Sequence, residues 1–293
     1  MLLAAPNVSE GRDLATVEAI SRAFTDGGEV RLLDVHSDGD HDRSVLTLAG
    51  EPGALADALV RGAAEVISRR IDVVSERDGG RGEHPHVGAL DVAPMIYLEE
   101  SSRGVACAEA LLIADRIGEE LGVPVFLYGE LGGGRTRADL RRGGIEGLTR
   151  RIAAGELRPD FGPSRPHPSA GVTLVAARAP LVAFNLQLAP PATVAEARAV
   201  AALIREGGQE GLPGLRAIGV GLGGGVAQVS MNVERPYEVS LARVVEAVRR
   251  HAEVASGELV GLAPRAALEG FPEDLPLPGF DPARHLIENV LAG

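Results

Sequence analysis

The sequence contains no lysine, so all 29 of its basic residues are arginine. A phosphate-binding P-loop and Schiff-base catalysis both need a lysine amine, and both are therefore excluded. Cysteine occurs once, at Cys107, which excludes an internal disulfide and favours a reducing compartment. Aromatic residues make up only 3% of the chain, so the core must be built mainly from Ala, Val, Leu and Ile.

Long apolar runs are also missing. No stretch of 18 or more apolar residues occurs, so no membrane span is expected. The segment 1–5 lacks the basic residues of a secretory signal, and none is expected. The net charge of −12 opposes binding to nucleic acid and to anionic lipid. We therefore expect a cytoplasmic protein with small-molecule substrates and neither nucleic-acid nor membrane partners. A homodimer is expected as well.

The first half of the chain shows apolar patterns in the order β-α-β-β-α-β, which is the order of ferredoxin-like folds. Its predicted strands lie at 2–8, 30–35, 44–49 and 92–98, and its predicted helices at 11–24 and 55–67. A helix at 106–121, a strand at 123–128 and a Gly/Arg-rich stretch to about 151 follow.

The second half repeats the same order. Its predicted strands lie at 181–188, 215–222, 226–233 and 258–262, its predicted helices at 193–206 and 241–248, and a last helix at 282–291. Thr193 and Glu196 have the spacing of a capping box at the start of the first of these helices. The predicted fold class is α+β, with two ferredoxin-like (βαββαβ) subdomains facing a shared cleft. We expect the subdomains to comprise residues 1–177 and 178–293.

Two motifs have ordinary structural explanations. The glycines at 219–224 match G-x-G-x-x-G, but a strand pattern follows them instead of a helix, which favours a hairpin turn over a dinucleotide site. Asp38, Asp40 and Asp42 resemble the start of a calcium loop, but the required Gly and Glu are absent. A solvated acidic turn is expected there, with weak metal binding through His36 and His41 as the alternative.

The stretch 80–91 carries the best candidate for a catalytic residue. His84 is followed by Pro85 in a polar, glycine-rich segment and is flanked by Arg81 and Glu83. An imidazole has a pKa near ~6.5 and can both accept and donate a proton at neutral pH. The alternative is a zinc site of His84 and His86, as in a metal hydrolase. The candidate further ligands, His36, Asp91 and His167, follow no known ligand spacing, so no metal is expected.

The stretch 159–171 holds four prolines and two glycines, which exclude a helix and a sheet interior. It is either a stiff linker between the subdomains or a rigid wall of a ligand site, and the two interpretations are compatible. Farther upstream, four arginines follow a glycine run, and they either bind substrate carboxylates or form a solvated helix face. They are Arg135, Arg137, Arg141 and Arg142.

Eight segments, taken together and in order, resemble the glutamate formimidoyltransferase family over nearly the whole chain. They are 6–12, 42–44, 82–85, 88–91, 123–130, 159–164, 183–185 and 228–232. The resemblance implies paired ferredoxin-like subdomains with folate in the groove between them, and tetrahydrofolate as co-substrate. It also implies transfer of a formimino group from formiminoglutamate to N5 of tetrahydrofolate. Animal members carry a cyclodeaminase domain after this one, and the length of this chain predicts the monofunctional form.

The resemblance also assigns site residues. His84 matches the family's catalytic histidine. The matched folate-binding stretch comprises Gly162, Pro163, Ser164, Arg165, Pro166, His167, Pro168, Ser169, Ala170 and Gly171. Supporting positions are Asn7, Asp42, Arg43, Arg81, Glu83 and Asp91.

The chain departs from the family at His86, where members usually have arginine. A cation that would meet a substrate carboxylate is thus replaced, and Arg81 is the candidate substitute. The substitution keeps open a folate-binding protein without turnover. The metal hydrolase is the third interpretation.

Overall fold

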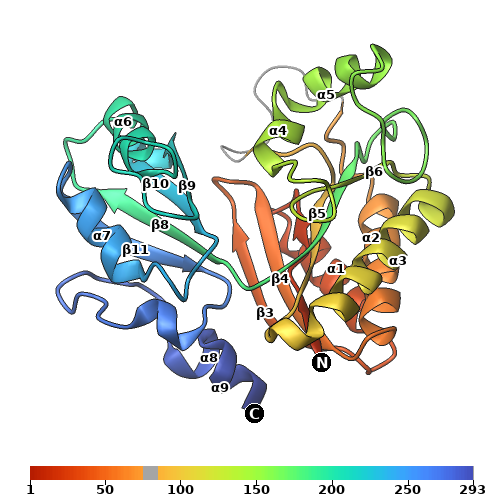
Figure 1. Cartoon of the computed structure of the whole chain (residues 1–293), viewed down its shortest axis with the longest axis horizontal. Coiled ribbons are helices and arrows are strands. Elements are labelled where there is room, and N and C mark those ends of the chain that lie inside the picture. The colour runs from red at the N-terminus through yellow and green to blue at the C-terminus, as the bar shows by residue number, and fades with distance from the viewer. Residues whose placement is uncertain (75–84, 293) are drawn as a thin grey trace. The chain divides into compact units, whose positions relative to one another are not determined.

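The computed structural model describes residues 1–74 and 85–292. The chain divides into two compact units, Met1–Ala179 and Pro180–Gly293. In Figure 1 the first unit runs from red to green and the second from green to blue. Within the described residues, no helix is both long enough and apolar enough to cross a bilayer.

The first unit is built on a seven-stranded mixed sheet in the order β3-β4-(β1, β2)-β5-β7-β6. Its strands are β1 (Leu2–Ala4), β2 (Asn7–Val8), β3 (Arg31–Asp38), β4 (Arg43–Gly50), β5 (Leu90–Ile96), β6 (Val125–Leu127) and β7 (Thr173–Arg178). The short strands β1 and β2 follow each other between β4 and β5 and pair antiparallel with both. Strands β5 and β6 each pair parallel with β7.

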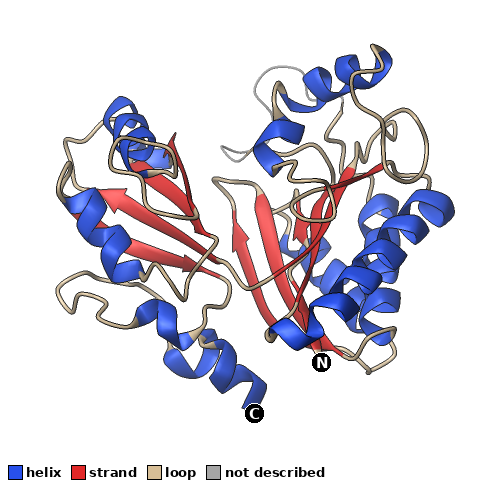
Figure 2. Ribbon diagram, viewed as in Figure 1, coloured by secondary structure: helices blue, strands red, loops and turns tan. Residues whose placement is uncertain are grey.

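Helices cover both faces of this sheet where β5, β6 and β7 lie. The helices are α1 (Leu14–Thr25), α2 (Ala54–Ser68), α3 (Arg103–Leu121), α4 (Arg137–Arg141) and α5 (Gly144–Ala153). Val175 and Ala177 of β7 join the core beneath α1, α2 and α3. The intervening Leu174 and Ala176 join a smaller core with Leu140 of α4 and Leu148 of α5. The period-2 alternation of a strand thus places α4 and α5 on the face opposite the three long helices, which Figure 2 shows in blue.

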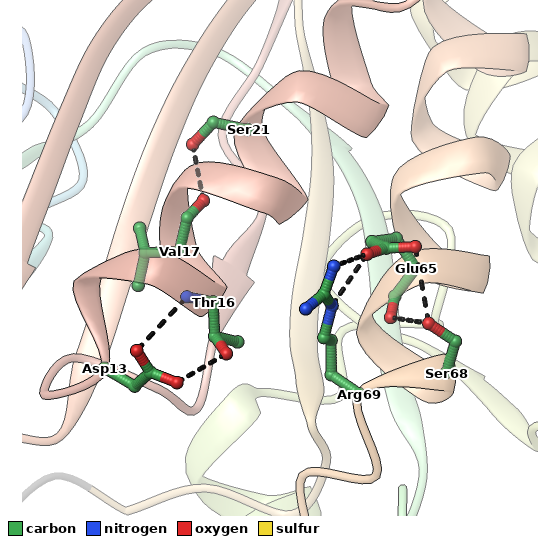
Figure 3. Close-up of polar contacts among 7 residues, drawn as sticks. All are labelled: Asp13, Thr16, Val17, Ser21, Glu65, Ser68 and Arg69. Atoms are coloured by element: carbon green, nitrogen blue, oxygen red, sulfur yellow. Dashed lines mark hydrogen bonds and ion pairs between the residues drawn. The ribbon is translucent and has the colours of Figure 1, made fainter.

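The ends of α1 and α2 are fixed by local polar contacts (Figure 3). The Asp13 carboxylate accepts hydrogen bonds from the backbone N–H and the hydroxyl of Thr16, which supply the capping that the first helical turn needs. These bonds hold the pKa of Asp13 below its usual value. In the last turn of α2, Glu65 accepts from the guanidinium of Arg69 at 2.5 Å.

The second unit has a four-stranded antiparallel sheet in the order β11-β8-β10-β9. Its main elements are β8 (Val182–Leu188), α6 (Val194–Ile204), β9 (Leu215–Gly221), β10 (Ala227–Val233), α7 (Leu241–Arg249) and β11 (Val254–Val260). Alternate residues of β8, such as Phe184 and Leu186, join the core with α6 and α7. The predicted β-α-β-β-α-β order is confirmed, as is the capping box of Thr193 and Glu196.

The turn at 219–224 is also as predicted. β9 ends at Gly221, whose Cα partner is Ala227 at the start of β10, and a single 3₁₀ turn, Gly223–Gly225, joins them. No helix N-terminus follows these glycines, so they form a hairpin and not a dinucleotide site.

Four element predictions need correction. Strand β7 was missed, because no strand was predicted between residues 128 and 181, whereas β7 (Thr173–Arg178) pairs with β5 and β6 of the first unit. The Gly/Arg-rich stretch contains the helices α4 and α5. The last helix is two short ones, α8 (Pro282–His285) and α9 (Ile287–Ala292), and β11 begins four residues earlier than predicted.

Candidate functional site

Four segments of the first unit meet at one end of its sheet: residues 9–11, 38–44, 87–91 and 167–172. Ser9 joins the first segment to the third, because its hydroxyl donates to the carbonyl of Gly88 at 2.7 Å and its N–H to the carbonyl of Ala89 at 2.9 Å. The hydroxyl of Ser44 donates to the carbonyl of Glu10 at 2.6 Å and joins the second segment to the first. Stretches that the sequence analysis selected separately are therefore neighbours in space.

The end of the proline-rich stretch lies directly against the segment 87–89. Gly88 and Gly171 form an antiparallel bridge. On either side of it, the N–H of Val172 donates to the carbonyl of Val87 at 3.0 Å, and that of Ala89 to the carbonyl of Ala170 at 2.9 Å. The end of the predicted folate-binding stretch is thus fixed to the residues that follow His84 in the chain.

The stretch 159–171 belongs to the first unit, since it leads from α5 into β7. The interpretation as a linker between the two halves is therefore wrong. Gly162 packs so closely on α3 that a Cβ there would lie 2.7 Å from the Cα of Gly118. The ring of His167 accepts a hydrogen bond from the N–H of Ala170 at 3.1 Å and closes the turn before β7. Ser164 and Arg165 are exposed.

Asp42 is buried and not solvated, so the prediction of a solvated turn is wrong at this position. Its carboxylate accepts from the N–H of Gly11 at 2.9 Å and lies 3.6 Å from the guanidinium of Arg12. Its backbone has a positive φ of 44°, a conformation that Asp tolerates better than most residues. Asp42 therefore holds together the two turns that border this end of the sheet.

Asp38 closes the same turn through His41. Its carboxylate accepts from the N–H groups of Asp40 and His41, and lies 2.6 Å from the His41 ring. Burial by itself raises the pKa of Asp38, but the hydrogen bonds from His41 outweigh it and lower this pKa well below its usual value.

Asn7 also has a local partner, because its side-chain amide donates to the carbonyl of Ala5 at 2.9 Å.

Asp91 is buried at the start of β5. One of its oxygens accepts from the N–H of Val87 at 2.8 Å, and the other forms an ion pair with Arg141 of α4. The carboxylate therefore ties the segment that follows His84 to α4. Burial, together with the positive charge of Arg141, lowers the pKa of the neighbouring Arg43 to about 10.

The four arginines that followed the glycine run have separate roles. Arg141 is mostly buried against Asp91. Arg135 pairs with Asp160 at 2.5 Å, and the guanidinium of Arg137 lies 5.8 Å from the ring centre of Tyr128. Arg142 is exposed. The pairing of Arg141 with Asp91 was not foreseen, because the two residues are far apart in sequence and meet only when α4 packs on the sheet.

Arg81, Glu83 and His84 lie outside the described residues, so their assignments remain predictions. His86 is half-buried. Across residues 1–74 and 85–292, no group of three or more His, Cys, Asp or Glu side chains is placed to hold a metal ion.

Comparison with known proteins identifies the family of the chain. Residues 1–178 match the N-terminal subdomain of the formiminotransferase domain. The chain belongs to the formiminotransferase family. It is 35% identical to a glutamate formimidoyltransferase of Streptococcus pyogenes serotype M1, with 98% of this chain and 97% of that protein covered. The family resemblance drawn from the sequence is confirmed.

Other relatives show the same relationship. A glutamate formimidoyltransferase of Thermoplasma acidophilum is 33% identical, with 94% of this chain and 92% of that protein covered. A formimidoyltransferase-cyclodeaminase of Mus musculus is 37% identical over 90% of this chain, but only 50% of that longer protein is covered. This formiminotransferase chain thus matches the two relatives named glutamate formimidoyltransferase over nearly their full length.

Proposed function

We propose that this formiminotransferase-family protein transfers a formimino group from N-formimino-L-glutamate to N5 of tetrahydrofolate, in the cytoplasm and as a step of histidine degradation. The observation that carries the proposal is the match over nearly full length to two proteins named glutamate formimidoyltransferase. Tetrahydrofolate is the co-substrate. A homodimer is proposed as well, and light scattering of the purified protein tests it.

In the proposed mechanism, N5 of tetrahydrofolate attacks the amidine carbon of the donor. N5 becomes cationic as the new bond forms and must lose a proton, whereas the departing nitrogen of glutamate must gain one. His84 serves as a single general acid–base that takes the first proton and delivers the second, because an imidazole changes its protonation state near neutral pH. Glutamate leaves as the bond from its nitrogen to the amidine carbon breaks.

The described residues support the assignment of His84 as the general acid–base, because they hold the backbone that follows His84 in the chain. Val87, three residues after His84, donates to Asp91 and accepts from Val172. Residues 162–171 are proposed as one wall of the folate site, and their prolines leave little chain entropy to be lost when the ligand binds. Asn7, Asp42, Arg43, Arg81, Glu83 and Asp91 are proposed to support the site.

We also propose that both units have the ferredoxin-like fold. In the second unit the observed strand order β11-β8-β10-β9 supports this, and in the first unit the strands β3, β4, β1 with β2, and β5 have the corresponding order. The units Met1–Ala179 and Pro180–Gly293 would be the two formiminotransferase subdomains. An experimental structure in which either group of strands had another order would contradict this.

The decisive experiment combines the purified protein with formiminoglutamate and tetrahydrofolate. Formation of the folate product is followed spectrophotometrically, and released glutamate is measured with a coupled dehydrogenase. We expect both signals, each dependent on both substrates and unchanged by a metal chelator. Folate binding without glutamate release would favour the binding protein. Glutamate release without folate, abolished by chelation, would favour the metal hydrolase.

A further inference from the structure

Arg43 at the start of β4 and Arg141 of α4 act electrostatically on each other near the segment 87–91, and are hereafter called the Arg43–Arg141 pair. Arg141 forms an ion pair with Asp91, and its side chain is 11% exposed. Arg43 is half-buried, and the charge of Arg141 is the largest electrostatic influence on it after burial. Arg43 lies next to Ser44 and Asp91 next to Leu90, and both Ser44 and Leu90 pair with Val8 of β2. The two guanidinium groups thus lie within electrostatic reach of each other and of the carboxylates of Asp91 and Asp38.

This group has hydrogen-bonding capacity left over. Within the described part of the chain, Nε of Arg141 is buried without a hydrogen-bond partner. So is the hydroxyl of Tyr128, a residue only 6% exposed that packs in the same small core as Leu140 of α4. Buried polar groups of native proteins are nearly always partnered, so unsatisfied donors beside buried cations indicate a ligand.

The charges around this site indicate that the ligand is negatively charged. One oxygen of Asp91 is engaged by the N–H of Val87. The other carboxylate that acts on Arg43, that of Asp38, is already engaged by His41. Removing like charges from water is costly unless anions compensate them. A planar carboxylate fits the donor geometry of guanidinium groups especially well.

We propose that the Arg43–Arg141 pair binds the α-carboxylate of the amino-acid donor. The proposal rests on the proposed formimino transfer, but it assigns a subsite that the transfer by itself does not specify. It also supplies the cation that the sequence lacks at His86, where the family usually has arginine.

The chemistry of the two substrates favours the donor over folate. In formiminoglutamate only the nitrogen and the α carbon separate the α-carboxylate from the amidine carbon that reacts. In folate the whole aminobenzoyl group lies between the reacting ring and the glutamyl carboxylates. Asp91 ties Arg141 to Val87, three residues from His84 in the chain. A carboxylate subsite at this point therefore suits the shorter separation.

The competing explanation is that Arg141 only holds α4 to the sheet through Asp91. Substrate and side chain must be changed together to separate the two roles. We would measure kcat/KM of wild type and Arg141→Gln with formiminoglutamate and with its α-amide. Arg142→Gln is the matched control, because it removes the same charge from the next, exposed position.

We expect Arg141→Gln to lower kcat/KM for formiminoglutamate about 10–100-fold, the usual range for a hydrogen bond to a charged group, with the KM for tetrahydrofolate within about two-fold. The α-amide should lower wild-type kcat/KM by a similar factor but cause little further loss in Arg141→Gln, because both changes remove one contact. Arg142→Gln should behave as wild type. Independent, multiplicative losses from the two changes would overturn the proposal.

A binding measurement separates failure of the subsite from failure of the transfer. N-formyl-L-glutamate has the same carboxylates with a formyl group in place of the formimino group, and its affinity is measurable by calorimetry without turnover. Weaker binding to Arg141→Gln would support the subsite even if no transfer occurred. Equal binding to both proteins would overturn it even in an active enzyme. If Arg141→Gln fails to fold by circular dichroism, the wild-type comparison of formiminoglutamate with its α-amide decides, and equal rates would overturn the proposal.

Discussion

Gly88 and Gly171 lie opposite each other in an antiparallel bridge, and neither position has room for a side chain. A Cβ on Gly88 would lie 1.8 Å from the carbonyl oxygen of Val172, and one on Gly171 would lie 2.3 Å from that of Val87. Gly171 also has a positive φ of 68°, which a residue with a Cβ adopts only at a cost. The bridge is therefore what fixes the proline-rich stretch beside the segment that follows His84.

We expect Gly88→Ala to lower the free energy of unfolding by about 1–3 kcal/mol, the usual cost of inserting a methyl group into a packed region. Turnover should fall as well, because the two segments must separate. Urea unfolding monitored by circular dichroism measures the first effect. Gly104→Ala, in α3 with nothing within 4 Å of the added Cβ, is the control and should not destabilise the protein. Equal stability of both variants would show that the bridge tolerates the methyl group.

We expect His84→Ala to preserve the fold and to lower turnover by about 10²–10⁴, the usual contribution of a general acid–base. Steady-state rates with formiminoglutamate and tetrahydrofolate provide the measurement. His251, which pairs with Glu210 at 3.0 Å in the second unit, provides the control variant His251→Ala, with turnover within about two-fold of wild type. Near-wild-type turnover of His84→Ala would remove this histidine from the mechanism.

We expect Arg165→Ala to weaken folate binding by about 1.5–3 kcal/mol, since the predicted contact is a charge-assisted hydrogen bond to a carboxylate of the ligand. Arg165 is exposed in the unliganded chain, so added salt should screen the contact and reduce the loss. Titration at low and moderate salt measures both effects. Arg158→Ala, another exposed arginine just outside the stretch, is the control. Unchanged affinity at both salt concentrations would mean that Arg165 does not contact the ligand.

We expect the stabilisation contributed by Asp38 to depend on pH in a defined direction. Because the pKa of Asp38 is lowered in the folded protein, its contribution is complete above the unfolded value of about 3.9 and is lost as the pH falls toward the folded value. The difference in unfolding free energy between wild type and Asp38→Asn should therefore be constant above about pH 5 and shrink below about pH 4. Asp40→Asn, at an exposed neighbouring position, should stay within about 0.5 kcal/mol of wild type. A difference that grows in acid would contradict the assignment.

Local patterns in the sequence identified most elements of the second unit correctly. The strands containing Phe184 and Val229 alternate apolar and polar residues, and Thr193 with Glu196 forms the capping box that its spacing predicts. These features depend on residues within one helical turn or one strand, so the sequence records them directly. The strand β7 was missed. Its apolar residues, by themselves, do not indicate which of the two units it belongs to. Only its parallel pairing with β5 and β6 decides that.

The sequence by itself determined the family, the helix and strand order of the second unit, and the exclusion of lysine-dependent chemistry. It also selected Asp91, the stretch 162–171 and the arginines near 141 as separate candidates. Only the tertiary structure decided that Asp42 is buried, that Gly171 lies against Gly88, and that Asp91 pairs with Arg141 instead of standing free. Asp91 and Arg141 are 50 residues apart, and such contacts form when helices and strands pack. Packing depends on the whole chain at once, and no local pattern encodes it.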